Sequence, residues 1–185
     1  LTRASPDMTL AAHHQQLRDA VRRCAAQRLA PNAPAGDRDK RFPREEVKGR
    51  TGLAHFLEHL MFKGTAALRK GDIDLVVLRN GGQSNADTTY DRTRYYFNFS
   101  RDSWERGLEI EADRMRHSNC PQEEFDNEKK VVLNELYIGL DDPNEVLMET
   151  VGSATFPVAR YHHPVIGWEE DVTTTTRERM LAYYR

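Results

Sequence analysis

The chain has the length of one domain, 185 residues, and its longest stretches without a charge run ten residues, about half of a membrane span. Its 27 basic and 29 acidic side chains give a net charge of −2, which excludes the cationic surplus typical of nucleic-acid binding. The only cysteines, Cys24 and Cys120, are far apart, which argues against a disulfide scaffold and a thiolate zinc site. We therefore expect a soluble protein; its compartment stays open, with the cytoplasm and the periplasm as the choices in a bacterium.

The character of the chain changes near residue 50. Residues 1–50 hold 11 basic and 6 acidic side chains, whereas the remainder holds 16 and 23. Residues 1–44 are rich in Ala, Arg and Pro, and their pattern predicts an amphipathic helix over about 8–29 and a loop or disordered linker over 31–43. This atypical segment is expected to precede one domain formed by residues 45–185.

The first elements of that domain are predicted from apolar spacing. The segment 51–63 has apolar residues around most of its circumference, which predicts a buried helix with Gly64 as its stop. A second helix is expected over 72–79, ending before Gly81 and Gly82. The alternation in 94–99 predicts a strand, and a short strand over 84–88 can pair with it.

Helices dominate the rest of the sequence. Asp102 and Glu105 have the spacing of a capping box, which predicts a helix through about residue 117. Pro121 predicts the start of another helix that runs to about 139, and two more helices are expected from about Asn144 and Thr176. These elements predict an α+β fold in which helices pack on one face of a mainly antiparallel sheet.

The strongest chemical motif is H-x-x-E-H in the first of these helices. His55 and His59 are four residues apart, so their imidazoles lie on one face and can bind the same metal ion. Glu58 lies beside them, within reach of a water on that metal. A chance occurrence is the alternative, but two histidines and a glutamate are costly to bury in an apolar helix unless a metal compensates them.

A catalytic zinc site usually has a third protein ligand, and spacing alone does not select it. Glu128 and Glu135 project from one helix face because seven residues make almost two full turns. On sequence alone, a solvated amphipathic face explains this pair better than a metal site does. Other carboxylates and three histidines also stay open as candidates: His117, His162 and His163.

Three segments together resemble a known family. The H-x-x-E-H motif is followed, 76 positions after its second histidine, by the glutamate of VVLNEL. This order resembles the inverzincin metallopeptidases of the pitrilysin, insulinase and mitochondrial processing peptidase family. TGLAHFLEHLMFKGT is similar to the family signature, GGQSNADTTYDRTRYYF to its glycine pair and following strands, and HHPVIGWEED to a later segment. The resemblance covers about 45–185.

The resemblance implies a zinc endopeptidase with a processing-peptidase-like fold. By position, it implies that Zn²⁺ is bound by His55, His59 and Glu135, that Glu58 is the general base toward a metal-activated water, and that Glu128 supports the site. The substrate, a peptide or an unfolded polypeptide segment, is expected to add as a strand to a sheet edge. The resemblance places three residues there: Asn85, Ala86 and Thr88. Without the resemblance, the pattern of Gly81, Gly82 and Asn85 predicts only a turn.

The chain also departs from the family pattern. Family members usually place two strands ahead of the histidine helix, whereas here the resemblance begins near Glu45, so the first strands are expected to be lacking. Truncation, rearrangement or a frameshift would produce such a start. Family members usually pair this domain with a similar, metal-free domain in the same chain or in another subunit, so a second family-type domain or subunit is an expected partner. Two functions follow: a zinc endopeptidase, or a truncated, non-enzymatic remnant or interaction subunit that keeps the zinc site.

Overall fold

The computed structural model of the chain describes residues 49–157 and 159–185. The helix and the linker predicted within 1–44 therefore lie outside the described residues. The elements follow in chain order: α3 (Leu53–Leu60), α4 (Asp72–Arg79), β1 (Gln83–Thr88), β2 (Thr93–Asn98), α5 (Glu105–His117), α6 (Gln122–Leu140), α7 (Pro143–Thr155), the short 3₁₀ helix η2 (Arg160–His162), α8 (Glu169–Thr174) and α9 (Arg177–Tyr184). No helix in this part of the chain is long and apolar enough to cross a membrane.

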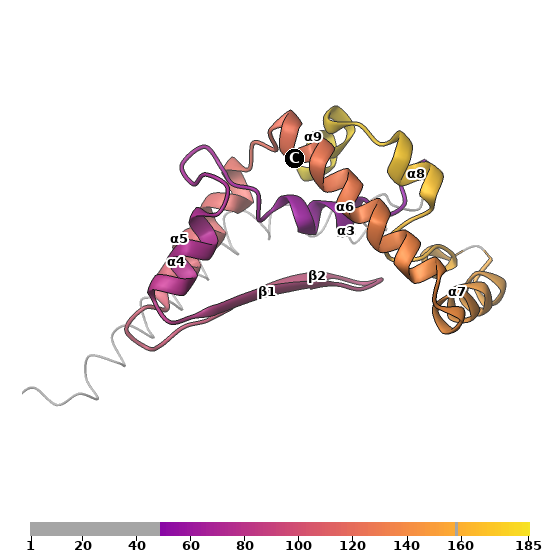
Figure 1. The fold of residues 1–185 in the computed structure, drawn as a ribbon, viewed down its shortest axis with the longest axis horizontal. Helices are drawn as coiled ribbons and strands as arrows, with labels where there is room; N and C mark the ends of the chain where they lie inside the picture. The colour runs from indigo at the N-terminus through magenta and orange to yellow at the C-terminus, as the bar shows by residue number, and fades with distance from the viewer. Residues whose placement is uncertain (1–48, 158) are drawn as a thin grey trace, which may run out of the picture. The chain divides into compact units, whose positions relative to one another are not determined.

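The two strands form an antiparallel hairpin, β1–β2, whose register pairs Gln83 with Asn98 and Thr88 with Thr93. Along β2, the partly buried side chains alternate with exposed ones, as expected for a sheet with one covered face. Helices α3 and α4 contact the hairpin, and α3 and α6 lie on the same side of it (Figure 1). The predicted α+β arrangement, with helices on one face of an antiparallel sheet, is confirmed.

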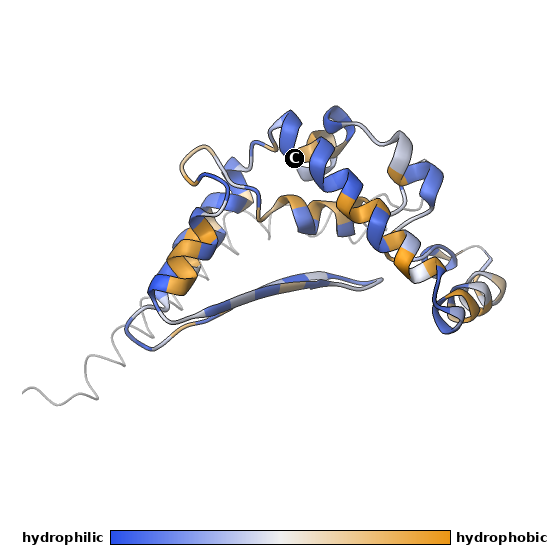
Figure 2. Ribbon diagram, viewed as in Figure 1, coloured by the Kyte–Doolittle hydropathy of each residue, from blue (hydrophilic) through white to orange (hydrophobic). Residues whose placement is uncertain are grey.

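The main core forms where α3 packs against α6, α8 and α9. The Phe56 ring of α3 stacks on Phe125 of α6 with 5.0 Å between ring centroids, and Met180 of α9 is fully buried beside them. In Figure 2, α3 is mostly hydrophobic with hydrophilic interruptions, and α6 shows hydrophobic bands along its length. The prediction that α3 is buried is confirmed, because none of its residues is exposed.

The start of α3 is fixed by a close approach of two loops. The Asp171 carboxylate accepts hydrogen bonds from the Thr51 backbone N–H (3.0 Å) and hydroxyl (2.5 Å). Gly52, the residue before the helix, has φ +79°, and a Cβ there would lie 2.2 Å from the Ile166 carbonyl oxygen. Only glycine fits such a conformation at that distance, so the approach requires Gly52.

The sequence-based boundaries need two corrections at helix starts. The predicted capping box of Asp102 and Glu105 is wrong. Helix α5 begins at Glu105 after Trp104, without a side-chain cap, and Asp102 lies outside the helix. The physical reason is a tight turn before the helix, in which the Ser103 N–H bonds to the Ser100 carbonyl and the Arg106 N–H bonds to the Ser103 carbonyl; Asp102 lies exposed in this turn. In addition, Pro121 is the residue that precedes α6 rather than a member of its first turn.

One helix, α8, was not expected from the sequence at all. It spans six residues, which is too few for an apolar period to show. Helix α4, by contrast, has the predicted bounds, and α6, α7 and α9 begin within a residue or two of their predicted starts.

Candidate metal centre

Helix α3 presents two imidazoles on one face. His55 and His59 are one turn apart, and their ring centroids are 4.7 Å from each other. Leu53, Phe56 and Leu60 on the opposite side of the helix are buried in the core, which fixes the rotation of α3 about its axis. The burial of these apolar residues therefore directs both histidines toward α6.

Helix α6 brings a carboxylate to the same place. Glu135 Oε1 lies 3.7 Å from His55 Nε2, and Glu135 Oε2 lies 3.4 Å from His59 Nε2. Val132 and Leu136, the buried neighbours of Glu135 on α6, anchor this part of the helix. One donor atom from each of the three side chains lies within 4.8 Å of the others, so the three could hold one metal ion.

Glu128 fixes the orientation of one imidazole from behind. Its Oε1 lies 3.0 Å from His59 Nδ1, and its Oε2 lies 2.6 Å from Lys63 Nζ. Burial opposes ionisation of Glu128, but the hydrogen bonds to His59 and Lys63 outweigh it and lower the pKa of the carboxyl group. An ionised carboxylate can only accept, so Nδ1 of His59 carries the proton and Nε2 faces Glu135.

The pKa values of the two histidines are shifted in opposite directions. Burial, together with the neighbouring His59, lowers the pKa of His55 to about 4, so His55 is neutral at neutral pH. Burial also opposes charge on His59, but Glu128, Glu135 and Glu58 outweigh it and raise its pKa. A metal ligand must be a neutral imidazole, so a bound cation would displace any second proton from His59.

This donor set fits a zinc ion. Two imidazole nitrogens and one carboxylate oxygen form a ligand combination typical of catalytic zinc. The carboxylate that holds His59 Nδ1 is a usual partner of a metal-bound histidine. Glu135 is half exposed, at 50% of its side-chain surface, so the group opens toward solvent on one side.

Glu58 leaves α3 beside the histidines but points toward the hairpin. Its Oε2 accepts a hydrogen bond from the Thr88 hydroxyl, at the end of β1. Thr88 also faces Thr93 across the hairpin, with 3.0 Å between the two hydroxyl oxygens. Glu58 therefore lies beside the metal-binding group, but its carboxylate is hydrogen-bonded to the hairpin and not to the histidines.

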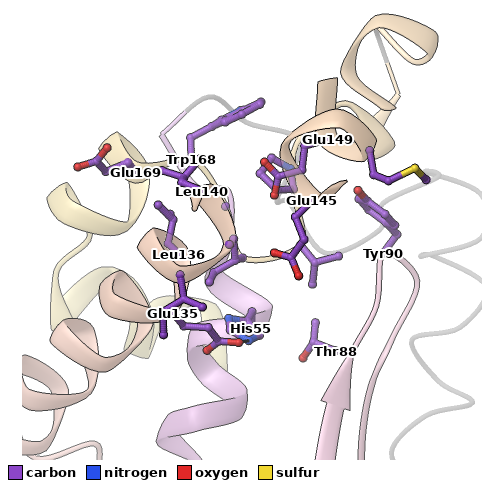
Figure 3. A pocket seen from close by; sticks show the side chains of 17 residues that line it. His55, Thr88, Tyr90, Glu135, Leu136, Leu140, Glu145, Glu149, Trp168 and Glu169 are labelled. Atoms are coloured by element: carbon purple, nitrogen blue, oxygen red, sulfur yellow. Dashed lines mark ion pairs between the residues drawn. The ribbon is translucent and has the colours of Figure 1, made fainter. Parts of the chain in front are cut away.

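A cavity of about 780 Å³ opens next to the candidate metal centre. In Figure 3, the Glu135 carboxylate lies next to His55 at one end, with Thr88 across from them on β1. Glu145 and Glu149 of α7 line the cavity farther from the histidines. Most of the remaining lining is apolar and comes from α6, α7 and the loop before α8, including Leu140, Met148, Ile166 and Trp168.

The structure brings together most of the residues selected from the sequence. His55, His59 and Glu135 meet directly, with Glu128 behind them and Glu58 beside them. Asn85 and Ala86 lie on β1, where the Asn85 side chain is exposed and its Oδ1 accepts a hydrogen bond from the Ala86 N–H. The alternative ligands lie outside the three-residue group: His117, which pairs with Asp113, His162, which contacts the Ser153 carbonyl, and His163.

Some residues at the site were missed by the sequence reasoning. Lys63 neutralises part of the charge on Glu128, and its position four residues after His59 is a spacing that indicates a shared helix face. Glu145 and Glu149 have the same spacing on α7. Their place beside the cavity depends on the turn between α6 and α7, which the sequence pattern does not specify.

Known proteins resemble this chain over most of its described part. The family model described as Insulinase (Peptidase family M16) matches residues 43–168. A zinc protease of Helicobacter pylori, PqqE, is 37% identical over 142 residues, which are 76% of this chain and 32% of that protein. The beta subunit of the mitochondrial-processing peptidase of Blastocladiella emersonii is 29% identical over 142 residues, 77% of this chain and 30% of that protein.

Solved structures agree with the sequence matches. The crystal structure of a protease from Helicobacter pylori superimposes with a TM-score of 0.73 at 34% identity, over 79% of this chain and 36% of that one. A peptidase M16 inactive domain from Pseudomonas fluorescens has the same fold, with a TM-score of 0.65 at 16% identity, over 72% of this chain and 33% of that one. The chain spans about a third of the length of the relatives that it matches.

Proposed function

Because the chain belongs to the insulinase family of peptidases (M16), we propose that it carries a zinc-dependent endopeptidase site that hydrolyses peptides or unfolded protein segments. The observation that carries the proposal is the convergence of His55, His59 and Glu135 within 4.8 Å. Relatives that match about three quarters of this chain are named zinc proteases.

In this proposal, His55 and His59 hold Zn²⁺ through Nε2, and Glu135 holds it through its carboxylate. Zinc, when bound, supplies a Lewis acid that polarises a carbonyl and acidifies water. Glu128 keeps His59 in the tautomer that leaves Nε2 free, and Lys63 holds Glu128 in its ionised form. The three proposed ligands and Glu128 lie on α3 or α6, so the site is largely preorganised.

Glu58 is the proposed general base. Its carboxylate accepts a proton from the attacking water and returns it to the leaving amine, so no covalent intermediate is required. The substrate is expected to lie against β1 as an added strand, near Asn85, Ala86 and Thr88. Among the described residues, β1 pairs only with β2, so its other edge can accept a peptide backbone.

The proposed substrates and partners are extended polypeptides and a second family-type domain. A solved relative, the ferredoxin protease FusC, 25% identical over 75% of this chain and 16% of that one with a TM-score of 0.65, was crystallised with ferredoxin. The matched mitochondrial protein is named as a subunit. Since this chain spans 30% of the mitochondrial protein and 16% of FusC, a partner that covers the metal centre would exclude water and hold the substrate strand.

A non-enzymatic role is the second candidate. One solved relative with this fold is described as an inactive domain, although its 16% identity supports the fold alone. In that role, the chain would keep its zinc site and act as an interaction subunit of a larger assembly.

Cleavage of an unfolded polypeptide such as reduced casein separates the two candidates. The endopeptidase proposal expects cleavage that stops when a zinc chelator is added and returns when zinc is restored. Glu58→Gln is the matched control, because it keeps the shape of the side chain and removes the base. If the parent chain binds zinc but cleaves nothing at any enzyme concentration, either alone or with a family-type partner half added, the result supports the interaction subunit instead.

A further inference from the structure

The hydroxyls of two facing threonines connect the hairpin to Glu58. Thr88 and Thr93 are a cross-strand pair at the end of the β1–β2 register. The Thr88 hydroxyl donates to Glu58 Oε2, and the two threonine hydroxyl oxygens are 3.0 Å apart. The three side chains therefore form one chain of hydrogen bonds from β2 through β1 to α3.

The direction of each hydrogen bond follows from the groups involved. A hydroxyl has a single proton, and an ionised carboxylate offers acceptors only. When Glu58 is ionised, the Thr88 hydroxyl donates its proton to Glu58. The Thr93 hydroxyl must then be the donor in the hydrogen bond between the two threonines. Thr93 thus holds Thr88 in the rotamer that points at Glu58.

This contact fixes Glu58 independently of the metal ligands. His55, His59 and Glu135 are oriented by the packing of α3 against α6, whereas Glu58 is oriented by the hairpin. A glutamate side chain has three rotatable bonds, while threonine is short and stiff at χ1. Among the described residues, Glu58 Oε1 has no hydrogen-bond donor, so this oxygen is available to a water while Oε2 is held.

We propose that Thr88, supported by Thr93, is a positioning residue for Glu58: it holds one carboxylate oxygen so that the other is presented to the attacking water. The inference rests on the proposed peptidase function. It differs from the role that the family resemblance implies for Thr88, which is contact with the substrate. The two roles separate kinetically, because loss of a substrate contact acts on KM, whereas loss of base orientation acts on kcat.

The first test is kinetic and uses the full 185-residue chain loaded with zinc, at high concentration against reduced casein, with a family-type partner half added to every variant if the parent alone does not turn over. We expect Thr88→Val to lower kcat about tenfold, equivalent to ~1.4 kcal/mol, with KM within about twofold of the parent. Thr88→Ser keeps the hydroxyl and should restore kcat to within about twofold. Thr93→Val should lower kcat about threefold, since Thr88 loses only its support. Thr174→Val, an exposed threonine on α8 bonded to the Glu170 carbonyl, is the control for loss of a hydroxyl.

The second test does not depend on activity. Melting temperatures of the metal-free parent, Thr88→Val, Glu58→Ala and the double variant form a mutant cycle. If Thr88 holds Glu58, the shift of the double variant falls short of the sum of the single shifts by about 2 °C or more. Zinc content equal to the parent in Thr88→Val shows that the metal centre remains intact.

The outcomes separate the inference from the function on which it rests. If the melting shifts of Thr88→Val and Glu58→Ala simply add in the double variant, Thr88 and Glu58 do not interact. An unchanged kcat in Thr88→Val overturns the positioning role, while the proposed peptidase function stands. A rise in KM with unchanged kcat assigns Thr88 to the substrate instead. No chelator-sensitive cleavage by the parent, either alone or with a family-type partner half added, overturns the proposed function and, with it, the role of Thr88 in the reaction.

Discussion

The close approach of two loops at the start of α3 predicts that Gly52→Ala is strongly destabilising. Gly52 has φ +79°, where an alanine costs about 1–2 kcal/mol. The added Cβ would lie 2.2 Å from the Ile166 carbonyl oxygen and 2.8 Å from its carbon, both backbone atoms that cannot rotate away. Relieving such overlap costs a further 1–3 kcal/mol, roughly, so we expect a total loss of about 2–5 kcal/mol in the free energy of unfolding.

Gly71→Ala is a matched control for this variant. Gly71 is the residue before α4, as Gly52 is before α3, and has φ +84°, but a Cβ there meets nothing within 4 Å. It should therefore lose only the conformational part, about 1–2 kcal/mol. Urea unfolding followed by far-UV circular dichroism measures both variants. Equal losses for the two, within about 0.5 kcal/mol, would refute the argument from the close approach.

The same substitution should also weaken zinc binding. His55 lies in the first turn of α3, three residues after Gly52, so a displaced helix start moves this imidazole away from Glu135. We expect Gly52→Ala to weaken zinc binding by tenfold or more, roughly, while Gly71→Ala stays close to the parent. A competitive chelator titration measures both affinities, and parent-like affinity in Gly52→Ala would contradict a link between the loop contact and the metal centre.

Three further predictions concern the metal centre and its supports. The purified chain should bind about one zinc, and His55→Ala or His59→Ala should remove most of it, which metal analysis measures; unchanged zinc in both variants would rule the site out. Glu58→Gln should keep the zinc and lose at least about a hundredfold in turnover, so near-parent cleavage by this variant would show that another group is the base. Asp171→Ala should lower the free energy of unfolding, measured by urea titration, by about 2–4 kcal/mol, because it leaves the buried Thr51 N–H and hydroxyl without their acceptor. A loss below about 1 kcal/mol would mean that water replaces the Asp171 carboxylate as the acceptor.

The partner proposal makes a prediction as well. The chain alone should be a weak peptidase or an inactive one, because an uncovered metal centre stays wet and holds a substrate strand poorly. Addition of a family-type strand pair and partner half should raise hydrolysis by orders of magnitude. Robust chelator-sensitive cleavage by the isolated chain would show that such a partner is not required.

The sequence by itself determined the local elements and the motif. Apolar spacing predicted α3 and α4 and placed His55 and His59 on one face, because helical geometry depends only on residues a few positions apart. The alternation in β2 predicted the hairpin in the same way. The family resemblance then selected Glu135 among several candidate ligands, a choice that spacing alone left open.

Tertiary structure alone decided which distant groups meet. The stack of Phe56 on Phe125 sets how α6 crosses α3, and this crossing brings Glu135 to the two histidines and Glu128 to His59. Glu58 is hydrogen-bonded to the hairpin and not to α6, because Thr88, the last residue of β1, lies beside α3. A sequence pattern records the face on which a side chain lies, but the neighbour that it meets there depends on packing between elements far apart in the chain.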